Sequence, residues 1–278
     1  MPTKYVEVQG YATYYHYVGR TTLPDVTPDF SRGRKMLFLH AAGSNGNSWH
    51  NQLDYFGVEH SPIALDLPGH GRSVGVEGFG SIREYADFVA AFLAALKLGS
   101  AVIVGRSMGG AIAMDLAVRY PKLVDGLVLI ATAAKFAIPP DRISGFKAVA
   151  QGRAPQAFMI AGFSPKTVAD NFNVIRESWM EQIKTDPRVR YTDMVACSEV
   201  DLRDEIGNIK KPVLVIAGAD DDNTPVSDAE LIKRQIGQHA RLEIIADAAH
   251  NVPTEKPREV NAAAERFLKS AFQNRARQ

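Results

Sequence analysis

The sequence predicts an α/β protein with a mostly parallel central sheet and helices on both faces of that sheet. Short, continuously apolar runs recur along the 278 residues and alternate with helical patterns. Such runs are typical of strands that are covered on both sides, and strands that alternate with helices imply right-handed crossovers. One long stretch, residues 134–208, has no such run and predicts a helical insertion.

The first predicted element is an antiparallel hairpin at one edge of the sheet. In residues 4–19, KYVEVQGYATYYHYVG, tyrosine and valine residues flank a turn at Gly10. Apolar residues arranged in this way around a glycine turn indicate two paired strands. Residues 21–35, TTLPDVTPDFSRGRK, are then predicted to form a loop.

The parallel strands and the helices between them follow in order. The predicted strands are MLFLH (36–40), PIALDL (62–67), AVIVG (101–105), GLVLIAT (126–132), VLVIAG (213–218) and LEIIAD (242–247). Apolar residues at helical spacing predict helices over residues 82–98 and 260–272. The basic end, NRARQ (274–278), is predicted to be frayed.

The insertion divides the chain into two predicted parts. Residues 1–133 and 209–278 form the sheet-containing core, and residues 134–208 form several short helices. Aromatic and apolar residues recur among charged ones in this insertion, together with prolines at 139, 140, 155, 165 and 187.

Composition restricts the possible partners. The formal charge of +1 gives no electrostatic reason to expect nucleic acid or an anionic membrane as a partner. The start, MPTKYVEVQG, lacks the pattern of a secretory signal, and no apolar run reaches membrane-spanning length. The single cysteine, Cys197, is interpreted as a packing residue in a protein without disulfides. We therefore expect a cytoplasmic monomer or homodimer that acts on a small molecule.

The stretch VGRSMGG (104–110) places a serine where a predicted strand gives way to a predicted helix. A serine hydroxyl needs a base nearby and a backbone that exposes its oxygen before it can act as a nucleophile. Gly105 and Gly109 suit a turn that is too tight for side chains, and Gly110 allows close helix packing. Ser107 is therefore a candidate nucleophile, with a helix N-cap as the alternative role.

The remaining catalytic groups should follow other strands. Catalytic groups gather at the carboxyl ends of parallel strands, which favours His40 and His250, and His250 also lies in a loop, DAAHNVP. A carboxylate must orient the imidazole. Three consecutive aspartates, residues 220–222, follow the strand VLVIAG, and this position alone does not choose among them.

These motifs resemble those of the α/β-hydrolase superfamily over nearly the whole chain outside the insertion. LFLHAAGSNGNSW resembles its oxyanion loop, DLPGHGRS the loop after its fourth strand, GRSMGG its nucleophile elbow, VLVIAGADDDNTP its acid loop, and AAHNVPTEKPREVN its histidine loop. They occur in the family's order of serine, acid and histidine.

The resemblance implies an α/β-hydrolase fold and further site residues. It assigns the acid to Asp221, the oxyanion-binding N–H groups to Met108 and Ala42, and a cap to residues 134–208. His40, Phe136, Phe158 and Trp179 are candidates for the substrate pocket, although the aromatic residues could equally serve in packing. Arg106 is less usual before the nucleophile, and we interpret it as a structural hydrogen-bond donor beneath the site.

The implied activity is that of a carboxylesterase-like enzyme. Ser107, His250 and Asp221 would cleave a small carboxylic ester through an acyl-enzyme, without a metal or organic cofactor. The same residues could instead act on a lactone, a thioester or a carbon–carbon bond, or catalyse cofactor-free perhydrolysis as in non-haem haloperoxidases. The alternative from another class is a ligand receptor on a hydrolase scaffold.

Overall fold

A sheet of eight strands forms the centre of the computed structural model, which describes residues 1–272. The strands are β1 (Thr3–Val8), β2 (Tyr11–Tyr17), β3 (Lys35–Leu39), β4 (Ser61–Leu65), β5 (Ala101–Arg106), β6 (Val124–Ile130), β7 (Val213–Gly218) and β8 (Ala240–Ile245). Their order is β1-β2-β4-β3-β5-β6-β7-β8. Strand β2 is antiparallel to β1 and β4, and the remaining pairs are parallel. The predicted fold class and edge hairpin are confirmed, whereas the predicted frayed end lies outside the described residues.

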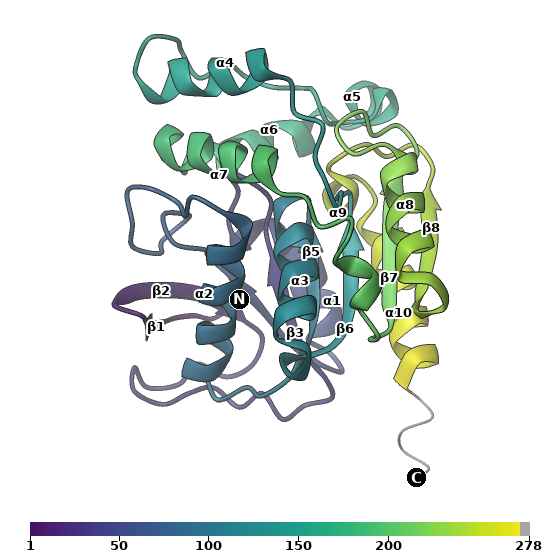
Figure 1. The fold of residues 1–278 in the computed structure, drawn as a ribbon. Coiled ribbons are helices and arrows are strands. Elements are labelled where there is room, and N and C mark those ends of the chain that lie inside the picture. Colours follow the sequence, from purple (N-terminus) through teal and green to yellow (C-terminus); the bar gives the residue numbers. More distant parts are fainter. Residues whose placement is uncertain (273–278) are drawn as a thin grey trace.

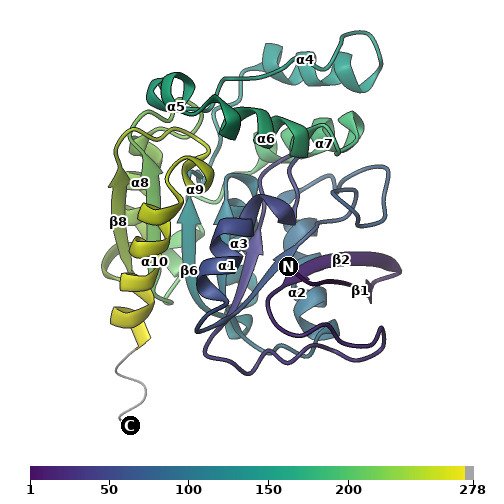
Figure 2. The same ribbon diagram turned by 180° about the vertical axis from the view of Figure 1, so that it is seen from behind.

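The apolar strands are buried on both faces because helices pack on each side of the sheet. On β3, Leu37 and Leu39 belong to one apolar cluster, whereas Met36 and Phe38 belong to the other. The first cluster includes residues of α2 (Ile82–Ala95), α3 (Met108–Arg119) and α8 (Val226–Ile236). The second includes residues of α1 (His50–Phe56) and α10 (Pro257–Phe272). The two groups of helices are seen on opposite faces in Figures 1 and 2.

The helices begin where local chemistry favours them. Helix α2 starts after Ser81, whose hydroxyl accepts from the Glu84 N–H and donates to the Glu84 carboxylate. Pro140, Pro165 and Pro187 are the first residues of their helices, where the missing N–H of proline costs no helical hydrogen bond. These prolines therefore divide the insertion into separate helices.

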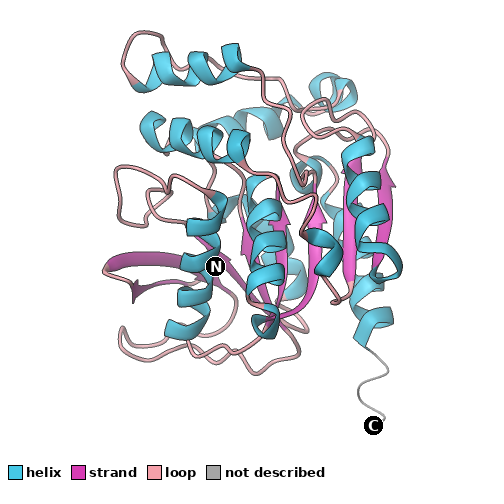
Figure 3. Ribbon diagram, viewed as in Figure 1, coloured by secondary structure: helices cyan, strands magenta, loops and turns pink. Residues whose placement is uncertain are grey.

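The four α-helices of residues 134–208 lie beyond the carboxyl ends of the strands, whereas residues 202–208 return towards the start of β7 and place Leu202 and Ile206 in the core. The four helices are α4 (Pro140–Ala150), α5 (Pro165–Asp170), α6 (Phe172–Gln182) and α7 (Pro187–Glu199), and α9 (Val252–Glu255) follows β8 in the core. Figure 1 places α4 outermost, with α6 and α7 between it and the sheet. The loops at this end of the sheet, drawn in pink in Figure 3, lie beneath these helices. The strand ends and the insertion thus enclose one region of the molecule.

Among residues 1–272, no helix is both long enough and apolar enough to cross a bilayer.

Candidate active site

Ser107 lies in a strained turn between β5 and α3. Its backbone has φ 53° and ψ −119°, a conformation that non-glycine residues rarely adopt. A Cβ atom at Gly105 would lie 2.2 Å from the carbonyl oxygen of Gly109, and one at Gly109 would lie 2.2 Å from that of Leu39. Both glycines are therefore required by close backbone approach. Ser107 occupies the N-cap position of α3, but its side chain makes no capping hydrogen bond to that helix.

The Ser107 hydroxyl instead faces His250, which follows β8. The His250 Nε2 atom lies 3.0 Å from the Ser107 Oγ atom, and the Nδ1 atom lies 2.9 Å from the Asp221 Oδ2 atom. Both contacts fit the tautomer in which Nδ1 carries the proton, because Nε2 can then accept from the serine hydroxyl. The structure thus brings together the serine, histidine and aspartate that the sequence proposed.

The loop after β7 holds the Asp221 carboxylate in place. Oδ1 accepts from the N–H groups of Asn223 and Thr224, and Oδ2 accepts from the Thr224 hydroxyl. Burial alone would raise the pKa of Asp221, but the hydrogen bond and charge of His250, together with the Thr224 donors, lower this pKa below its ordinary value. Asp221 is therefore a carboxylate that accepts from the imidazole, whereas Asp220 and Asp222 are exposed.

Two backbone N–H groups are available near the serine. Met108 is the first residue of α3, where an N–H has no partner within the helix. Ala42 lies in the loop after β3 and lines the same cavity as Ser107. Among residues 1–272, neither N–H donates to another protein group. These are the two donors that the family resemblance implied for an oxyanion.

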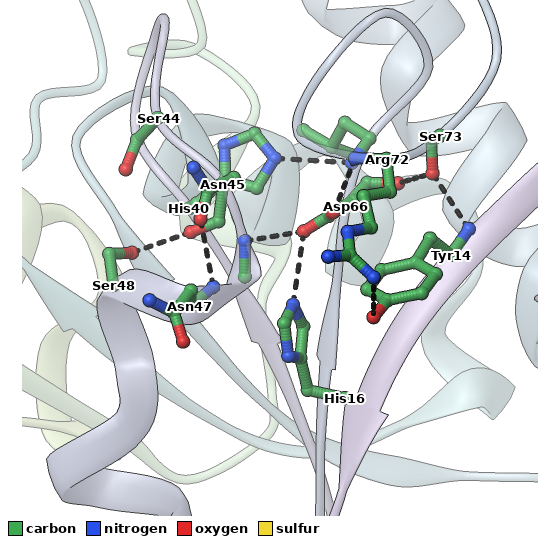
Figure 4. A network of polar contacts seen from close by, with 12 residues as sticks. Tyr14, His16, His40, Ser44, Asn45, Asn47, Ser48, Asp66, Arg72 and Ser73 are labelled. Atoms are coloured by element: carbon green, nitrogen blue, oxygen red, sulfur yellow. Dashed lines mark hydrogen bonds and ion pairs between the residues drawn. The ribbon is translucent and has the colours of Figure 1, made fainter. Parts of the chain in front are cut away.

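A buried carboxylate on each side fixes the loop that carries Ala42. Asp66, after β4, accepts from the Gly46 N–H (2.6 Å) and from the Arg72 N–H (2.9 Å), and it lies 3.5 Å from the His16 Nε2 atom. Figure 4 shows Asp66 between His16 and this loop. Burial alone would raise the pKa of Asp66, but His16 and the Arg72 N–H lower it overall.

Asp193 of α7 is the second carboxylate, and it reaches down from the insertion. Its Oδ2 atom accepts from the Gly43 N–H at 2.8 Å and lies 2.7 Å from His70 Nε2, while its Oδ1 atom accepts from the Tyr85 hydroxyl at 2.5 Å. Burial alone would lower the pKa of His70, but the charge and hydrogen bond of Asp193 raise this pKa overall. The aspartate thus links α7 to the loop after β3, to the loop after β4 and to α2.

A cavity of about 510 Å³ opens above Ser107. Ser107, Ala42 and His250 line it from the core, and Phe136 and Trp179 line it from the insertion. Two predicted pocket residues lie elsewhere. His40 is wholly buried beneath the site, where its Nε2 atom accepts from the Leu67 N–H, and burial lowers its pKa to about 3. Phe158 is 44% exposed and packs on Phe172 and Trp179 outside the cavity.

Arg106 lies below the histidine loop. Its guanidinium group donates to the Asn251 Oδ1 atom at 2.8 Å, and burial lowers its pKa to about 10. Asn251 in turn donates through its Nδ2 and backbone N–H groups to the Gly162 carbonyl oxygen of the insertion. Arg106 is therefore a hydrogen-bond donor to the histidine loop, and it also lines the cavity above Ser107.

The sequence reasoning did not identify Asp193, Asp66 or the cavity-lining residues Arg142 and Arg190. A signal for Asp193 is present: the positions one helical turn away, Val189 and Ala196, are apolar and buried, which puts this aspartate on the buried face of α7. No comparable local pattern identifies its partners, because His70 and Gly43 come from distant segments.

No group of three or more His, Cys, Asp and Glu side chains within residues 1–272 is arranged to hold a metal ion. Cys197 is buried, and burial raises its thiol pKa well above the ordinary value.

The chain is similar in sequence and in fold to known proteins. A sequence model described as "Alpha/beta hydrolase family" matches residues 36–263. The chain is 28% identical over 267 residues to 3-oxoadipate enol-lactonase 2 of Acinetobacter baylyi, an alignment that covers 92% of this chain and 98% of that protein. It is 29% identical over 255 residues to the non-heme chloroperoxidase of Burkholderia pyrrocinia, covering 84% and 91%. A solved esterase from Thermogutta terrifontis shares the fold, with a TM-score of 0.82 at 23% identity and coverage of 98% and 99%.

Proposed function

Because this chain belongs to the alpha/beta hydrolase family, we propose that it hydrolyses a small carboxylic ester through Ser107, His250 and Asp221. The observation that carries the proposal is the continuous pair of contacts from Ser107 Oγ to His250 Nε2 (3.0 Å) and from His250 Nδ1 to Asp221 Oδ2 (2.9 Å). A serine activated by an oriented imidazole is the arrangement that acyl transfer requires.

In the first step, the Ser107 oxygen attacks the ester carbonyl carbon while His250 Nε2 takes the hydroxyl proton. The carbonyl oxygen becomes an oxyanion, which the N–H groups of Met108 and Ala42 stabilise. Loss of one such donor typically lowers the rate about 10²–10³-fold. Asp221 stabilises the imidazolium that forms and preserves its orientation.

In the second step, the imidazolium gives its proton to the departing alcohol, which leaves an acyl-enzyme on Ser107. A water molecule then attacks the acyl carbon and loses a proton to His250 Nε2. Collapse of this second tetrahedral intermediate releases the acid and returns the proton to the serine oxygen.

We assign the cavity wall opposite Ser107 to a cap made of residues 134–208, with residues 1–133 and 209–278 as the core. Phe136, Met159 and Trp179 supply apolar side chains to that wall. Burial of an apolar acyl chain against such side chains is favourable. The space beneath the insertion is limited, which supports a preference for small substrates.

Lactones are the second candidate class. The relative from Acinetobacter baylyi is an enol-lactonase, and it aligns over 92% of this chain. A lactone is a cyclic ester, so the same attack by Ser107 opens its ring without releasing a separate alcohol.

A fluorophosphonate probe tests whether Ser107 is an activated nucleophile. We expect the wild-type protein to be labelled and the Ser107→Ala and His250→Ala variants to remain unlabelled. Labelling that survives Ser107→Ala would overturn the proposal. An unlabelled wild type would favour a binding protein on this scaffold.

A substrate panel then separates the ester classes. Esters of graded acyl length, lactones and thioesters are compared by kcat/KM. A decline with acyl length is expected because the cavity holds only about 510 Å³. A flat profile across acyl lengths would contradict the enclosed pocket.

A further inference from the structure

Positive charge gathers in the wall of the cavity above Ser107. Arg106, Arg142 and Arg190 line the cavity, whereas Asp222 is the one carboxylate among the described residues that do so. Asp222 is itself exposed to solvent. The enclosed part of the cavity therefore carries an excess of cationic groups.

The charge of Arg106 is balanced by neighbouring groups of the protein. Its guanidinium group donates to Asn251, and the nearby carboxylates of Asp221 and Glu255 favour its charged form. The excess charge therefore comes from the other two arginines.

In the part of the chain that the structure describes, the guanidinium groups of Arg142 and Arg190 contact neutral groups. Arg142 Nη1 donates to the Asn223 side-chain oxygen at 2.7 Å, Arg190 Nη2 lies 3.4 Å from the Met159 sulfur, and the Arg190 guanidinium carbon lies 4.9 Å from the centre of the Phe146 ring. Within residues 1–272, no carboxylate lies within 4.0 Å of the side-chain nitrogens of either arginine. Each guanidinium group has five N–H donors, so several remain to be matched.

Asp193 lies on the same helix as Arg190 and its charge raises the pKa of Arg190, but no Asp193 oxygen lies within 4.0 Å of the Arg190 side-chain nitrogens. Asp193 accepts hydrogen bonds from Gly43 and Tyr85 and forms an ion pair with His70, whose raised pKa favours the charged imidazole. Burial lowers the pKa of Arg190 and the charge of Arg142 lowers it further, while the charge of Asp193 opposes these effects only in part. An anion that contacts both guanidinium groups would offset the repulsion between them.

The two arginines lie where they could contact the end of a substrate that is remote from Ser107. Arg142 and Arg190 also line a second cavity of about 360 Å³, to which Ser107 and His250 do not contribute. The arginines therefore lie where the two cavities meet, and the nucleophile lies in the first cavity alone. The Arg190 stem passes the oxyanion loop, since a Cβ atom at Gly43 would lie 2.8 Å from its Cγ atom.

We propose that Arg142 and Arg190 bind a carboxylate of the substrate, so that the enzyme acts on esters or lactones that also carry an acidic group. This inference rests on the hydrolase function proposed above. Arginine suits the role because its planar fork can donate two parallel hydrogen bonds to one carboxylate.

The test compares substrates that differ in charge but not in size. Ethyl monoesters of succinic, glutaric and adipic acid are measured beside the matching esters in which a carboxamide replaces the free carboxylate. We expect the wild-type enzyme to prefer the carboxylate about ten- to a hundredfold in kcat/KM at the best chain length, chiefly through KM. Equal or better hydrolysis of the carboxamide at every length would overturn the proposal.

Variants show whether the two arginines cause the preference. In Arg190→Gln and in Arg142→Gln, the ratio of kcat/KM between carboxylate and carboxamide should fall towards one. Arg188→Gln is the matched control, because Arg188 is exposed on the same helix and paired with Asp186, and it should keep the wild-type ratio. A wild-type ratio in both arginine variants would refute the assignment. Should Arg190→Gln fail to fold, Arg142→Gln decides alone, since α4 has no buried residue.

Binding measured with an inactive variant distinguishes the hydrolase proposal from the acidic-substrate inference. Calorimetry with the Ser107→Ala variant should show glutarate binding at least about tenfold more tightly than glutaramide. Failed fluorophosphonate labelling of the wild type would remove the hydrolase proposal. Normal labelling combined with equal binding of glutarate and glutaramide would remove only the acidic-substrate inference.

Discussion

Ser107 has a strained backbone that the residues around it maintain. A positive φ at a non-glycine residue costs of order 1–3 kcal/mol, and it persists only where the surroundings impose it. Here the carbonyl groups of Leu39 and Gly109 approach so closely that Gly105 and Gly109 cannot carry a side chain. The exposed serine oxygen is thus a product of backbone packing.

Replacing Gly109 with alanine should therefore destabilise the protein. The new methyl group would meet the Leu39 carbonyl oxygen at 2.2 Å, and overpacking of this kind costs about 1–3 kcal/mol. Gly145→Ala is the matched control, since a Cβ there meets nothing within 4 Å, and alanine in a helix is about 1 kcal/mol better than glycine. Urea unfolding measures both changes, and equal stability of the two variants would contradict the packing argument.

Arg106 offers a second prediction for a single residue. In Arg106→His, the hydrogen bond to Asn251 is lost or lengthened, so the free energy of unfolding should fall by about 1–3 kcal/mol while acyl preference stays unchanged. Thermal unfolding and the ester panel provide the measurements. Arg203→His, at an exposed ion pair, is the control for loss of an arginine. A changed acyl preference in Arg106→His would instead make Arg106 a substrate contact.

At this scale, sequence reasoning predicted residues whose roles depend on local patterns. Ser107 was found from its glycines and His250 from its loop, and the family's loop spacing assigned Asp221. His40 was considered as a base because it follows a strand and was also named for the pocket, yet its ring turns inward, where Nε2 accepts from the Leu67 N–H. Asp193 was missed because its role comes from partners more than 100 residues away, such as Tyr85 at a separation of 108.

Helix α7 connects the insertion to the loop after β3 through Asp193. The aspartate, with no exposed surface, accepts from the Gly43 N–H beside Ala42. Movement of this helix would therefore alter the position of the Ala42 N–H, and misplacement of a catalytic group by about 1 Å can lower the rate up to 10²-fold.

The Asp193→Asn variant should accordingly lower kcat by about tenfold, with less effect on KM for a neutral ester. Asparagine keeps the size of the side chain but weakens the charged hydrogen bond to Gly43. Asp170→Asn, at an exposed ion pair of α5, serves as the control and should leave both constants unchanged. Steady-state kinetics gives kcat and KM for both variants. An unchanged kcat in Asp193→Asn would show that the Asp193–Gly43 contact does not position the loop after β3.

The Asp193–His70 pair also predicts how stability depends on pH. The pKa of His70 is raised in the folded protein, so the charged pair contributes fully below the ordinary imidazole value of about 6.5 and is lost as the pH rises through the folded value. The free energy of unfolding should fall more steeply above pH 6.5 in the wild type than in Asp193→Asn. Urea unfolding at a series of pH values above 6.5 measures this free energy for both proteins. If it falls equally with pH in the two proteins, the charged pair is ruled out.

The strands themselves were predicted well, and their ends less well. Each predicted run lies on a strand because burial on both faces requires continuous apolar residues. The predictions at residues 36–40, 62–67, 126–132 and 242–247 extend one or two residues too far. Some residues beyond these ends, such as Leu67, Ala131 and Thr132, are as buried as the strands themselves, so apolar or small composition does not mark where strand pairing stops.

In the molecule as a whole, burial is distributed unevenly between core and insertion. Helix α3 and strand β5 are almost entirely buried, whereas α4 has no buried residue and α6 has only Ile175. Regions with few buried apolar contacts open at a lower free energy than the core.

Hydrogen exchange should therefore separate the two parts. The amides of α4 are expected to exchange at low opening free energy, while those of β5 and α3 should approach the global unfolding free energy. Native-state exchange monitored by mass spectrometry provides the measurement. Equal protection of α4 and β5 would mean that the insertion and the core unfold as one cooperative unit.

The contact between Asp193 and Gly43 limits how freely the insertion can be exchanged between proteins. A chimera that grafts a foreign segment onto this core would replace the acceptor for the Gly43 N–H and the counter-ion of His70 together. Protein engineers who transplant such a segment to change substrate range should therefore retain an aspartate at this position of the new helix. Without it, the graft would form a new pocket above a loop whose Ala42 N–H, the proposed oxyanion donor, is poorly aligned.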